Sequence, residues 1–335
     1  MKIETRLTRL LGIDLPICQA GMSWASSNSA LPLAVARAGG LGVLAAGPMY
    51  LDALEQAIDE IRAGTDRPFA VNLPLYNKRA EEMMDLLEMK RVPILVCSQG
   101  GPKKYIDRFK AIGTRCLHVV AGETHAVKAM EAGVDGLVVV GGEAGGHPPP
   151  TQVSTLVLVR AVSHATEGRI PLIASGGFAD GRGLLAALSL GADGANFGTR
   201  FIATPEAGVS VGYKEAVLGA RVADTVCVGQ GLGMIRAIRN PFTDRMVDLE
   251  NSGASLDDRR DVFAGATLKM AALDGDVEGG KLEAGQSTGL VGAIKPAHLV
   301  VEEIAEDYLR ALAALPGRTF LNGRYSYDEG EKVNG

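Results

Sequence analysis

The stretch Pro171-Leu-Ile-Ala-Ser-Gly-Gly-Phe-Ala-Asp-Gly-Arg-Gly183 is followed closely by Gly191-Ala-Asp-Gly-Ala-Asn-Phe-Gly-Thr-Arg-Phe201. Each half has a short apolar run and then small residues whose backbone N–H groups are free to bind a ligand. In a (β/α)8 barrel, the loops after strands 7 and 8 often bind the phosphate of a cofactor or substrate. A single glycine pair usually marks a plain tight turn, whereas two on consecutive strand ends favour such a phosphate site.

The rest of the chain repeats this alternation of strand and helix. Strand-like runs begin at Pro16, Leu41, Phe69, Pro93, Arg115, Gly136, Pro171 and Ala195. Helical patterns cover 30–39, 51–63, 78–90, 102–112, 123–132, 153–167, 181–190 and 205–219. Most of the strand-like runs are continuously apolar, which is typical of parallel strands buried on both faces. Eight strand–helix units in succession predict an α/β fold, a closed TIM (β/α)8 barrel.

The pattern changes after about residue 220. Residues 221–285 are charged and helix-like without clear strands, and we interpret them as a small helical lid domain inserted after the eighth strand. A final helix from 296 to 315 is expected to return to the barrel wall, so the predicted barrel comprises 1–220 and 286–335. The polar tail 318–335 is expected to be disordered at its end.

Composition narrows the function classes. The 335 residues are 47% hydrophobic and carry a formal net charge of −5, which gives no basic footprint for nucleic acid. No run reaches the ~18 apolar residues of a membrane helix, and the N-terminus lacks a signal-peptide core. The four cysteines lie far apart, and no His, Cys or carboxylate set suggests a metal. We therefore expect a cytoplasmic protein with reduced thiols and a small-molecule substrate, and we leave a homodimer open.

Candidate site residues follow several strands. Gly141-Gly-Glu-Ala-Gly-Gly-His147 comes after the sixth strand, which predicts His147 at the C-terminal mouth where barrel active sites lie. A histidine can accept or donate a proton near neutral pH, so we interpret His147 as catalytic. The alternative is a ring that only hydrogen-bonds its own loop.

Asn72 ends the third strand and suits the polar edge of a flavin or base, or else satisfies loop backbone groups. His118, within the fifth strand, is expected in the core or beside such a flavin.

Together these motifs resemble the flavin-dependent nitronate monooxygenase (2-nitropropane dioxygenase) family. Its superfamily also contains flavin-type enoyl-ACP reductases and an NADH:quinone reductase group. The resemblance covers nearly the whole chain. It is carried by Pro16-Ile-Cys-Gln-Ala-Gly-Met22, Arg67-Pro-Phe-Ala-Val-Asn72, Glu143-Ala-Gly-Gly-His147, Ala174-Ser-Gly-Gly-Phe-Ala-Asp-Gly-Arg-Gly183, Gly198-Thr-Arg-Phe201 and Ala284-Gly-Gln286.

The resemblance implies an FMN-binding barrel and a role for each matching residue. Gly21, Met22 and Ser23 would border the isoalloxazine ring, Asn72 would contact its polar edge, and Gly145 would line the side of the ring. The phosphate would be held by Ser175, Gly176, Gly177, Gly198 and Thr199. Gln286 would close the site from the lid. His147 matches the residue that removes the α-proton in the family's nitroalkane oxidisers.

The resemblance leads to one main functional hypothesis and two alternatives. The main one is an FMN-dependent nitronate monooxygenase that oxidises nitroalkanes or nitronates with O2. The first alternative is a reductase in which NAD(P)H reduces FMN, which then reduces an enoyl thioester or a quinone. The second is a flavin-binding module without catalysis.

Individual positions bear on the reductive alternative. Val119 stands where the quinone reductases carry a flavin-facing lysine, which weakens that assignment. Residues 275–290 resemble the enoyl-ACP reductases closely. An acyl-carrier-protein substrate would require basic residues around the mouth, and the lid has five arginines that could serve. A charged face that is simply exposed to solvent explains these arginines equally well. These arginines are Arg236, Arg239, Arg245, Arg259 and Arg260.

Overall fold

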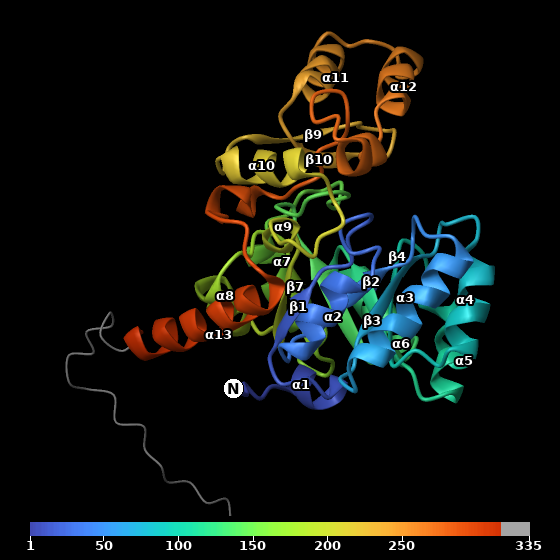
Figure 1. Ribbon diagram of the computed structural model, residues 1–335, viewed down its shortest axis with the longest axis vertical. Helices are drawn as coiled ribbons and strands as arrows, with labels where there is room; N and C mark the ends of the chain where they lie inside the picture. Colours follow the sequence, from blue (N-terminus) through green and yellow to red (C-terminus); the bar gives the residue numbers. More distant parts are fainter. Residues whose placement is uncertain (316–335) are drawn as a thin grey trace, which may run out of the picture.

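The computed structural model describes residues 1–315, so the predicted disordered tail 318–335 lies outside the described residues. Eight parallel strands form one sheet in the order β1-β8-β7-β6-β5-β4-β3-β2 (Figure 1). Their bounds are β1 (Ile17–Gln19), β2 (Val43–Ala45), β3 (Ala70–Pro74), β4 (Ile94–Ser98), β5 (Arg115–Val120), β6 (Gly136–Val140), β7 (Leu172–Ser175) and β8 (Gly194–Phe197). The predicted TIM barrel is confirmed.

The barrel closes between β1 and β2 through a short seam. The Leu41 N–H donates to the Ile17 carbonyl at 2.9 Å, and the Gln19 N–H donates to the Leu41 carbonyl at 2.9 Å. The fully buried side chain of Gln19 then continues the ladder: its amide accepts from the Val43 N–H at 3.0 Å and donates to the Val43 carbonyl at 3.2 Å. A side-chain amide thus satisfies backbone groups that would otherwise be buried unpaired.

Helices surround the sheet. They are α1 (Arg6–Leu11), α2 (Ala30–Arg37), α3 (Leu51–Gly64), α4 (Ala80–Met89), η1 (Pro102–Lys104), α5 (Ile106–Ala111), α6 (Glu123–Glu131), α7 (Thr155–Ala165), α8 (Gly181–Ser189), α9 (Thr199–Ile202), α10 (Val211–Gly219), η3 (Gln286–Leu290) and α13 (Ala297–Ala314). The helix predicted at 205–219 is α10, which begins only at Val211, and the short helix α9 before it was not predicted. The helix α13 packs on α8 and α2, so the predicted return to the barrel wall is confirmed.

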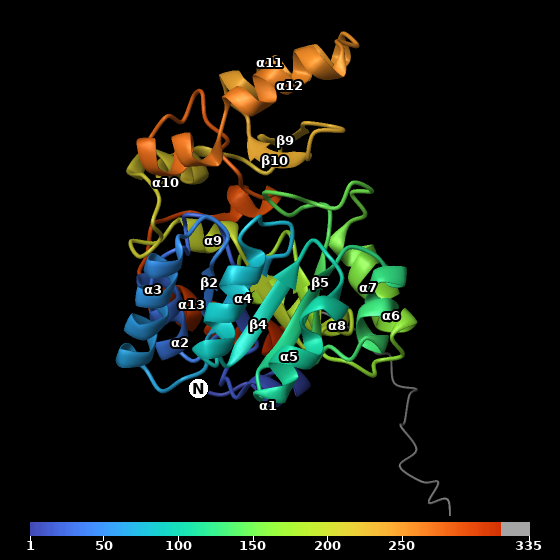
Figure 2. The ribbon, with the colours of Figure 1, turned by 90° about the vertical axis from the view of Figure 1, so that its right-hand side faces the viewer.

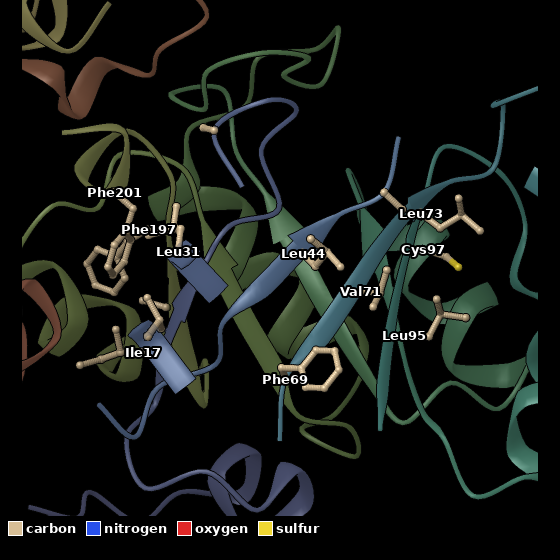
Figure 3. Close-up of a cluster of buried hydrophobic side chains, with 14 of the residues drawn as sticks. Ile17, Leu31, Leu44, Phe69, Val71, Leu73, Leu95, Cys97, Phe197 and Phe201 are labelled. Atoms are coloured by element: carbon tan, nitrogen blue, oxygen red, sulfur yellow. The ribbon is translucent and has the colours of Figure 1, made fainter. Parts of the chain in front are cut away.

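Strand residues alternate between two apolar clusters. Ile17, Val71 and Leu95 point outward into the layer between sheet and helices, and Figure 3 shows them there. Their neighbours, such as Cys18 and Ala70, belong to a separate cluster inside the barrel. Since successive strand residues face opposite sides, the inward positions at the carboxyl ends of the strands are left to line a cavity.

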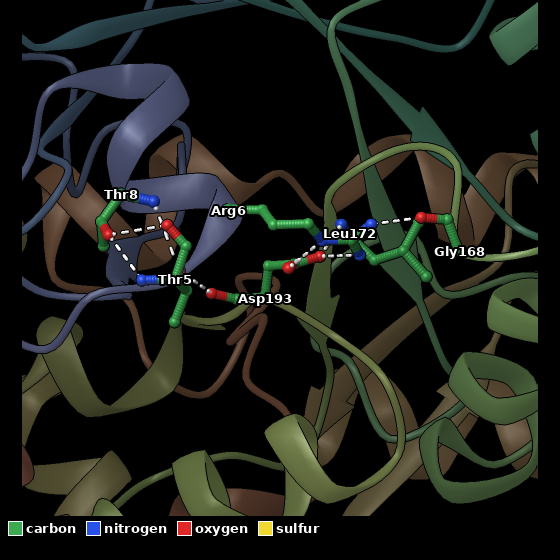
Figure 4. A network of polar contacts seen from close by, with 6 residues as sticks. All are labelled: Thr5, Arg6, Thr8, Gly168, Leu172 and Asp193. Atoms are coloured by element: carbon green, nitrogen blue, oxygen red, sulfur yellow. Dashed lines mark hydrogen bonds and ion pairs between the residues drawn. The ribbon is translucent and has the colours of Figure 1, made fainter. Parts of the chain in front are cut away.

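A polar network ties the opposite end of the barrel together (Figure 4). The Asp193 carboxylate, just before β8, accepts from Arg6 Nε at 2.7 Å, from Arg6 Nη2 at 2.8 Å and from the Leu172 N–H at 3.0 Å. Thr5 Oγ1 donates to the Asp193 carbonyl at 2.7 Å, and Arg6 also donates to the Gly168 carbonyl. This buried carboxylate therefore joins α1 to the starts of β7 and β8.

We expect Asp193→Ala to lower the free energy of unfolding by about 2 kcal/mol, because the buried Leu172 N–H loses its side-chain acceptor. Urea denaturation followed by circular dichroism measures the change. Flavin binding should be unaffected, since the network lies at the end of the barrel away from the cavity. An unchanged denaturation midpoint would show that α1 contributes nothing through this carboxylate.

The segment between β8 and α13 lies over one end of the barrel (Figures 1 and 2). It contains β9 (Thr225–Val228), β10 (Ile235–Ile238), α11 (Pro241–Asn251), α12 (Leu256–Gly265) and the π-helical turn η2 (Met270–Asp274). The expectation that 221–285 holds no strand is wrong, because β9 and β10 form an antiparallel pair. Each strand has only four residues, and β10 includes a buried arginine, so neither shows an apolar run long enough to predict.

Among the described residues, no helix combines the length and the apolar character that a membrane span requires.

Candidate active site

A cavity of about 1350 Å³ lies between the carboxyl ends of the strands and the lid segment. It brings together nearly all the residues predicted from sequence: Gly21, Met22, Ser23, Asn72, Gly145, His147, Ser175, Gly176, Gly177, Gly198 and Thr199. The exception is Gln286, whose neighbours Gly285 and Ser287 line the cavity while its own N–H donates to the Glu143 carbonyl at 3.0 Å.

The ends of β7 and β8 form a glycine cradle. Gly176 and Gly177 have φ of +113° and +81°, and a Cβ added at Gly176 would lie 2.7 Å from Thr155 Oγ1. Glycine adopts two consecutive left-handed conformations without strain, whereas other residues do not. Loops of this kind suit phosphate binding through their backbone N–H groups. The Thr199 hydroxyl accepts from the Gly285 N–H at 2.9 Å, which ties the lid segment to this cradle. The cradle therefore fits the phosphate of FMN.

Asn72 and Gly21 meet on the other side of the mouth. The Asn72 amide nitrogen donates to the Val96 carbonyl at 3.1 Å, so it satisfies a backbone group of strand β4 and not one of a loop. Its Oδ1 makes no hydrogen bond to any residue in 1–315 and remains available to a ligand. A Cβ at Gly21 would lie 2.6 Å from Asn72 Cβ, so glycine is what allows the loop after β1 to approach this amide.

The ring of His147 opens into the cavity. Burial among protein atoms lowers its pKa below the ordinary histidine value of 6.5, and the Lys281 cation lowers it further. Neither ring nitrogen is hydrogen-bonded within the described residues, so the ring does not serve as an anchor for its own loop. At neutral pH the imidazole is therefore uncharged and able to accept a proton.

Arg236 holds the loop that carries His147. Its backbone exchanges hydrogen bonds with Gly146, at 2.7 Å from the Arg236 N–H and 3.1 Å from the Gly146 N–H. Its buried guanidinium donates to the Gly142 carbonyl at 2.8 Å and to Gln152 Oε1 at 3.2 Å. One residue of β10 thus holds both ends of the loop 142–146.

We expect Arg236→Met to lower kcat by about 10- to 100-fold, because a small displacement of a catalytic group is enough to cost that much. The matched control is Arg239→Met, since Arg239 is exposed and pairs only with Asp244 at 3.0 Å. Steady-state kinetics of the two purified flavoproteins compare them. Equal kcat values in both variants would contradict a positioning role for Arg236.

Three of the five lid arginines are not free to form a basic surface. Arg236 is buried, whereas Arg239 and Arg260 pair with Asp244 and Asp257. None of the five lid arginines is among the residues that line the cavity.

The charged residues that do line the cavity were missed by sequence reasoning. They are three lysines, Lys128, Lys269 and Lys281, and one carboxylate, Glu283. The only sequence signal was the alternation Lys281-Leu-Glu283 before Ala284, which looks the same as an ordinary half-exposed extended segment. The cavity is therefore more cationic than a chain of net charge −5 suggests.

Two residues of β5, His118 and Val119, were expected from the sequence to lie near a flavin, and both line the cavity. His118 is both buried and at the cavity edge, and its Nδ1 lies 2.8 Å from the Tyr105 hydroxyl. Burial lowers its pKa. Val119 lines the cavity as an apolar residue, so no cation reaches a flavin from that position.

Sequence comparison agrees with this geometry. The nitronate monooxygenase family model matches residues 4–92 and 76–307. The chain belongs to the nitronate monooxygenase family. It is therefore an oxidoreductase of a flavin-dependent family, and its TIM barrel is that family's fold.

Proteins whose names state different activities are similar to it. A Mycobacterium tuberculosis protein named (3aS,4S,5R,7aS)-5-hydroxy-7a-methyl-1-oxo-octahydro-1H-indene-4-carboxyl-CoA dehydrogenase is 33% identical, covering 93% of this chain and 98% of that protein. A probable nitronate monooxygenase of Staphylococcus saprophyticus is 30% identical, covering 87% and 94%. The structure of FabK from Thermotoga maritima superposes with a TM-score of 0.89 at 38% identity, covering 95% of this chain and 100% of that chain.

Proposed function

We propose that this protein is an FMN-dependent oxidoreductase that oxidises an acyl thioester of the coenzyme A type, with His147 as the base. The observation that carries the proposal is that one cavity holds the glycine cradle, the uncharged His147 and three lysines. A bound FMN supplies a two-electron acceptor for this chemistry.

The chain's own residues divide the work. Gly176, Gly177 and Gly198 would hold the cofactor phosphate, and Asn72 Oδ1 would accept a hydrogen bond from the polar edge of the flavin ring. His147 would take the proton from the α-carbon, whose acidity the thioester carbonyl raises. The hydride of the neighbouring β-carbon would then go to the two-electron acceptor that a bound FMN supplies, and the product would be the 2-enoyl thioester. Arg236 would hold the His147 loop in place.

Cavity size and charge support a large anionic substrate. Pockets for drug-sized ligands span about 300–1,000 Å³. The 1350 Å³ here leaves space for a further extended ligand beside FMN. Of the three lysines, Lys128 and Lys269 suit the phosphates of coenzyme A, while Lys281 lies over the Phe263 ring. The relative from M. tuberculosis carries the words carboxyl-CoA dehydrogenase in its name, which adds support.

Nitronate monooxygenase activity is the second candidate. It is favoured by the same uncharged His147, because a nitroalkane must also lose its α-proton before oxidation, and by the match to the family. In this case O2 would complete the oxidation of the nitronate. A small nitroalkane would leave much of the cavity unfilled and the lysines without a ligand, so we place this candidate second.

Anaerobic mixing with possible electron donors tests the proposal. The purified FMN-loaded protein is mixed in separate experiments with butyryl-CoA, ethylnitronate, NADH and NADPH, and the flavin absorbance near ~450 nm is followed. We expect butyryl-CoA to bleach the flavin within seconds. Bleaching by ethylnitronate alone would establish the second candidate.

Other outcomes identify the remaining alternatives. Bleaching by NADH or NADPH but not by butyryl-CoA would make this a nicotinamide-dependent reductase, and crotonyl-CoA or a quinone would then be tested as the acceptor. A flavin that no donor reduces would support a binding module without catalysis.

A further inference from the structure

Glu283 is a carboxyl group in the wall of the cavity with no role in the chemistry described above. It lies on the extended segment that leads from η2 to η3, two residues beyond Lys281. Its side chain reaches the loop that carries the base: a methyl group placed on Gly146 would lie 3.1 Å from Glu283 Oε2. Gly146 immediately precedes His147, so the carboxyl group and the imidazole belong to the same part of the cavity.

Within residues 1–315, the Glu283 carboxyl group makes no hydrogen bond and no ion pair. Its backbone carbonyl is occupied by the buried Tyr213 hydroxyl at 2.8 Å, but the carboxyl oxygens are not. The nearest cation, Lys281, is held elsewhere, since its Nζ lies 3.5 Å from the centroid of the Phe263 ring. The side chain is half-buried and lines the cavity.

This environment is costly for a charge. Burial raises the pKa of Glu283 to about 7, and Lys281 offsets only part of the effect. The titratable groups around it are Lys281 on its own segment, Tyr213 of α10, whose hydroxyl binds the Glu283 backbone carbonyl, and His147, which follows Gly146. When a substrate displaces water from the cavity, the carboxyl group needs a hydrogen-bonding partner from the substrate, because no residue supplies one.

We propose that Glu283 selects acyl thioesters that carry a hydroxyl group close to the reacting carbons, over plain hydrocarbon chains. This inference rests on the proposed function. A hydroxyl group both donates and accepts, so it pairs with the carboxyl group in either protonation state. An alkyl chain offers neither and leaves the carboxyl group desolvated without a partner. Sites built to hydrogen-bond a substrate hydroxyl reject analogues that lack it.

Equilibrium binding tests the proposal without relying on turnover. Isothermal titration calorimetry of the FMN-loaded protein, kept anaerobic with its flavin reduced beforehand so that neither ligand can be oxidised, compares 3-hydroxybutyryl-CoA with butyryl-CoA, which differ by one hydroxyl group. We expect the hydroxylated ligand to bind about 10- to 100-fold more tightly. In Glu283→Met, an apolar side chain of similar length, the preference should disappear, mainly through tighter binding of butyryl-CoA.

Two controls keep the result interpretable. Glu283→Gln, which retains a donor and an acceptor, should keep most of the preference. If Glu283→Met does not retain FMN, Glu283→Leu, which also lacks a hydrogen-bonding group, replaces it in the comparison. Lys269→Met removes a lysine of the cavity rim and should weaken both ligands equally.

Failure of the Glu283 role can be distinguished from failure of the proposed function. Equal binding of the two ligands by the wild-type protein, or an undiminished preference in Glu283→Met, overturns the role of Glu283 alone. Failure of both ligands to bind the wild-type protein overturns the proposed acyl-CoA function and this inference with it.

Discussion

Replacing His147 by glutamine is expected to lower kcat/KM for any substrate that must lose an α-proton by about 10²–10⁴-fold. Glutamine keeps a polar side chain of similar reach but cannot accept the proton. FMN should remain bound, because the cradle that holds its phosphate lies on β7 and β8 and not on the His147 loop. Turnover and flavin content of the purified variant measure the two effects separately.

A matched control and a chemical bypass accompany this variant. His164→Gln changes an exposed histidine of α7 and should leave kcat/KM unchanged. If nitronate oxidation is the activity, a preformed nitronate needs no deprotonation, so His147→Gln should oxidise ethylnitronate but not nitroethane. Equal turnover of a neutral substrate by the variant and the wild type would disprove the base assignment.

The pH dependence gives an independent check. The pKa of His147 is lowered below 6.5, so the imidazole is unprotonated above that pH and becomes protonated below it. Wild-type kcat/KM should therefore fall only on the acid side of 6.5, and this fall should be absent in His147→Gln. A fall that persists near pH 7 in that variant would belong to Glu283, whose pKa is about 7.

The second large effect is expected at the glycine cradle. In Gly176→Ala the added methyl group would lie 2.7 Å from Thr155 Oγ1 and 3.3 Å from the Ala144 nitrogen, on a residue with φ of +113°. Either the loop or α7 must shift, which displaces the N–H groups that would hold the phosphate. We expect FMN to bind about 10- to 100-fold more weakly, as measured by fluorescence titration of the apoprotein.

Gly113→Ala separates backbone strain from this steric effect. Gly113 also has a positive φ, +83°, but nothing lies within 4 Å of its added Cβ, and it precedes β5 at the end of the barrel away from the cavity. This control should cost about 1 kcal/mol of stability and leave FMN affinity unchanged. Unchanged FMN affinity in Gly176→Ala would show that the cofactor phosphate is held elsewhere.

Local patterns in the chain were enough to predict the barrel and most of the candidate site. Continuous apolar runs separated by helical patterns predict parallel strands, and parallel strands place all their carboxyl ends at one mouth. Residues at or after the carboxyl end of a predicted strand, such as Asn72, His147 and Ser175, could therefore be assigned to one site without knowing any contact between them. The structure shows all three lining one cavity.

The lid was harder to predict because its structure depends on distant partners. The four-residue strands β9 and β10 are stable only as a pair, and β10 carries Arg236, whose buried guanidinium finds its acceptor at Gly142. A charged residue is ordinarily read as exposed. Nothing near Arg236 in the chain indicates that a carbonyl 94 residues away replaces its solvent shell.

By itself, then, the sequence determined the fold class, the mouth at which the candidate site lies, and the strand-end residues found there, because these follow from periodicity and from the direction of parallel strands. Only the tertiary structure decided that Glu283 faces the His147 loop, that Lys281 and not the lid arginines lines the cavity, and that Gln286 does not. The physical reason is that burial and the distance between charges depend on how the lid packs over the barrel, and no local pattern encodes that packing.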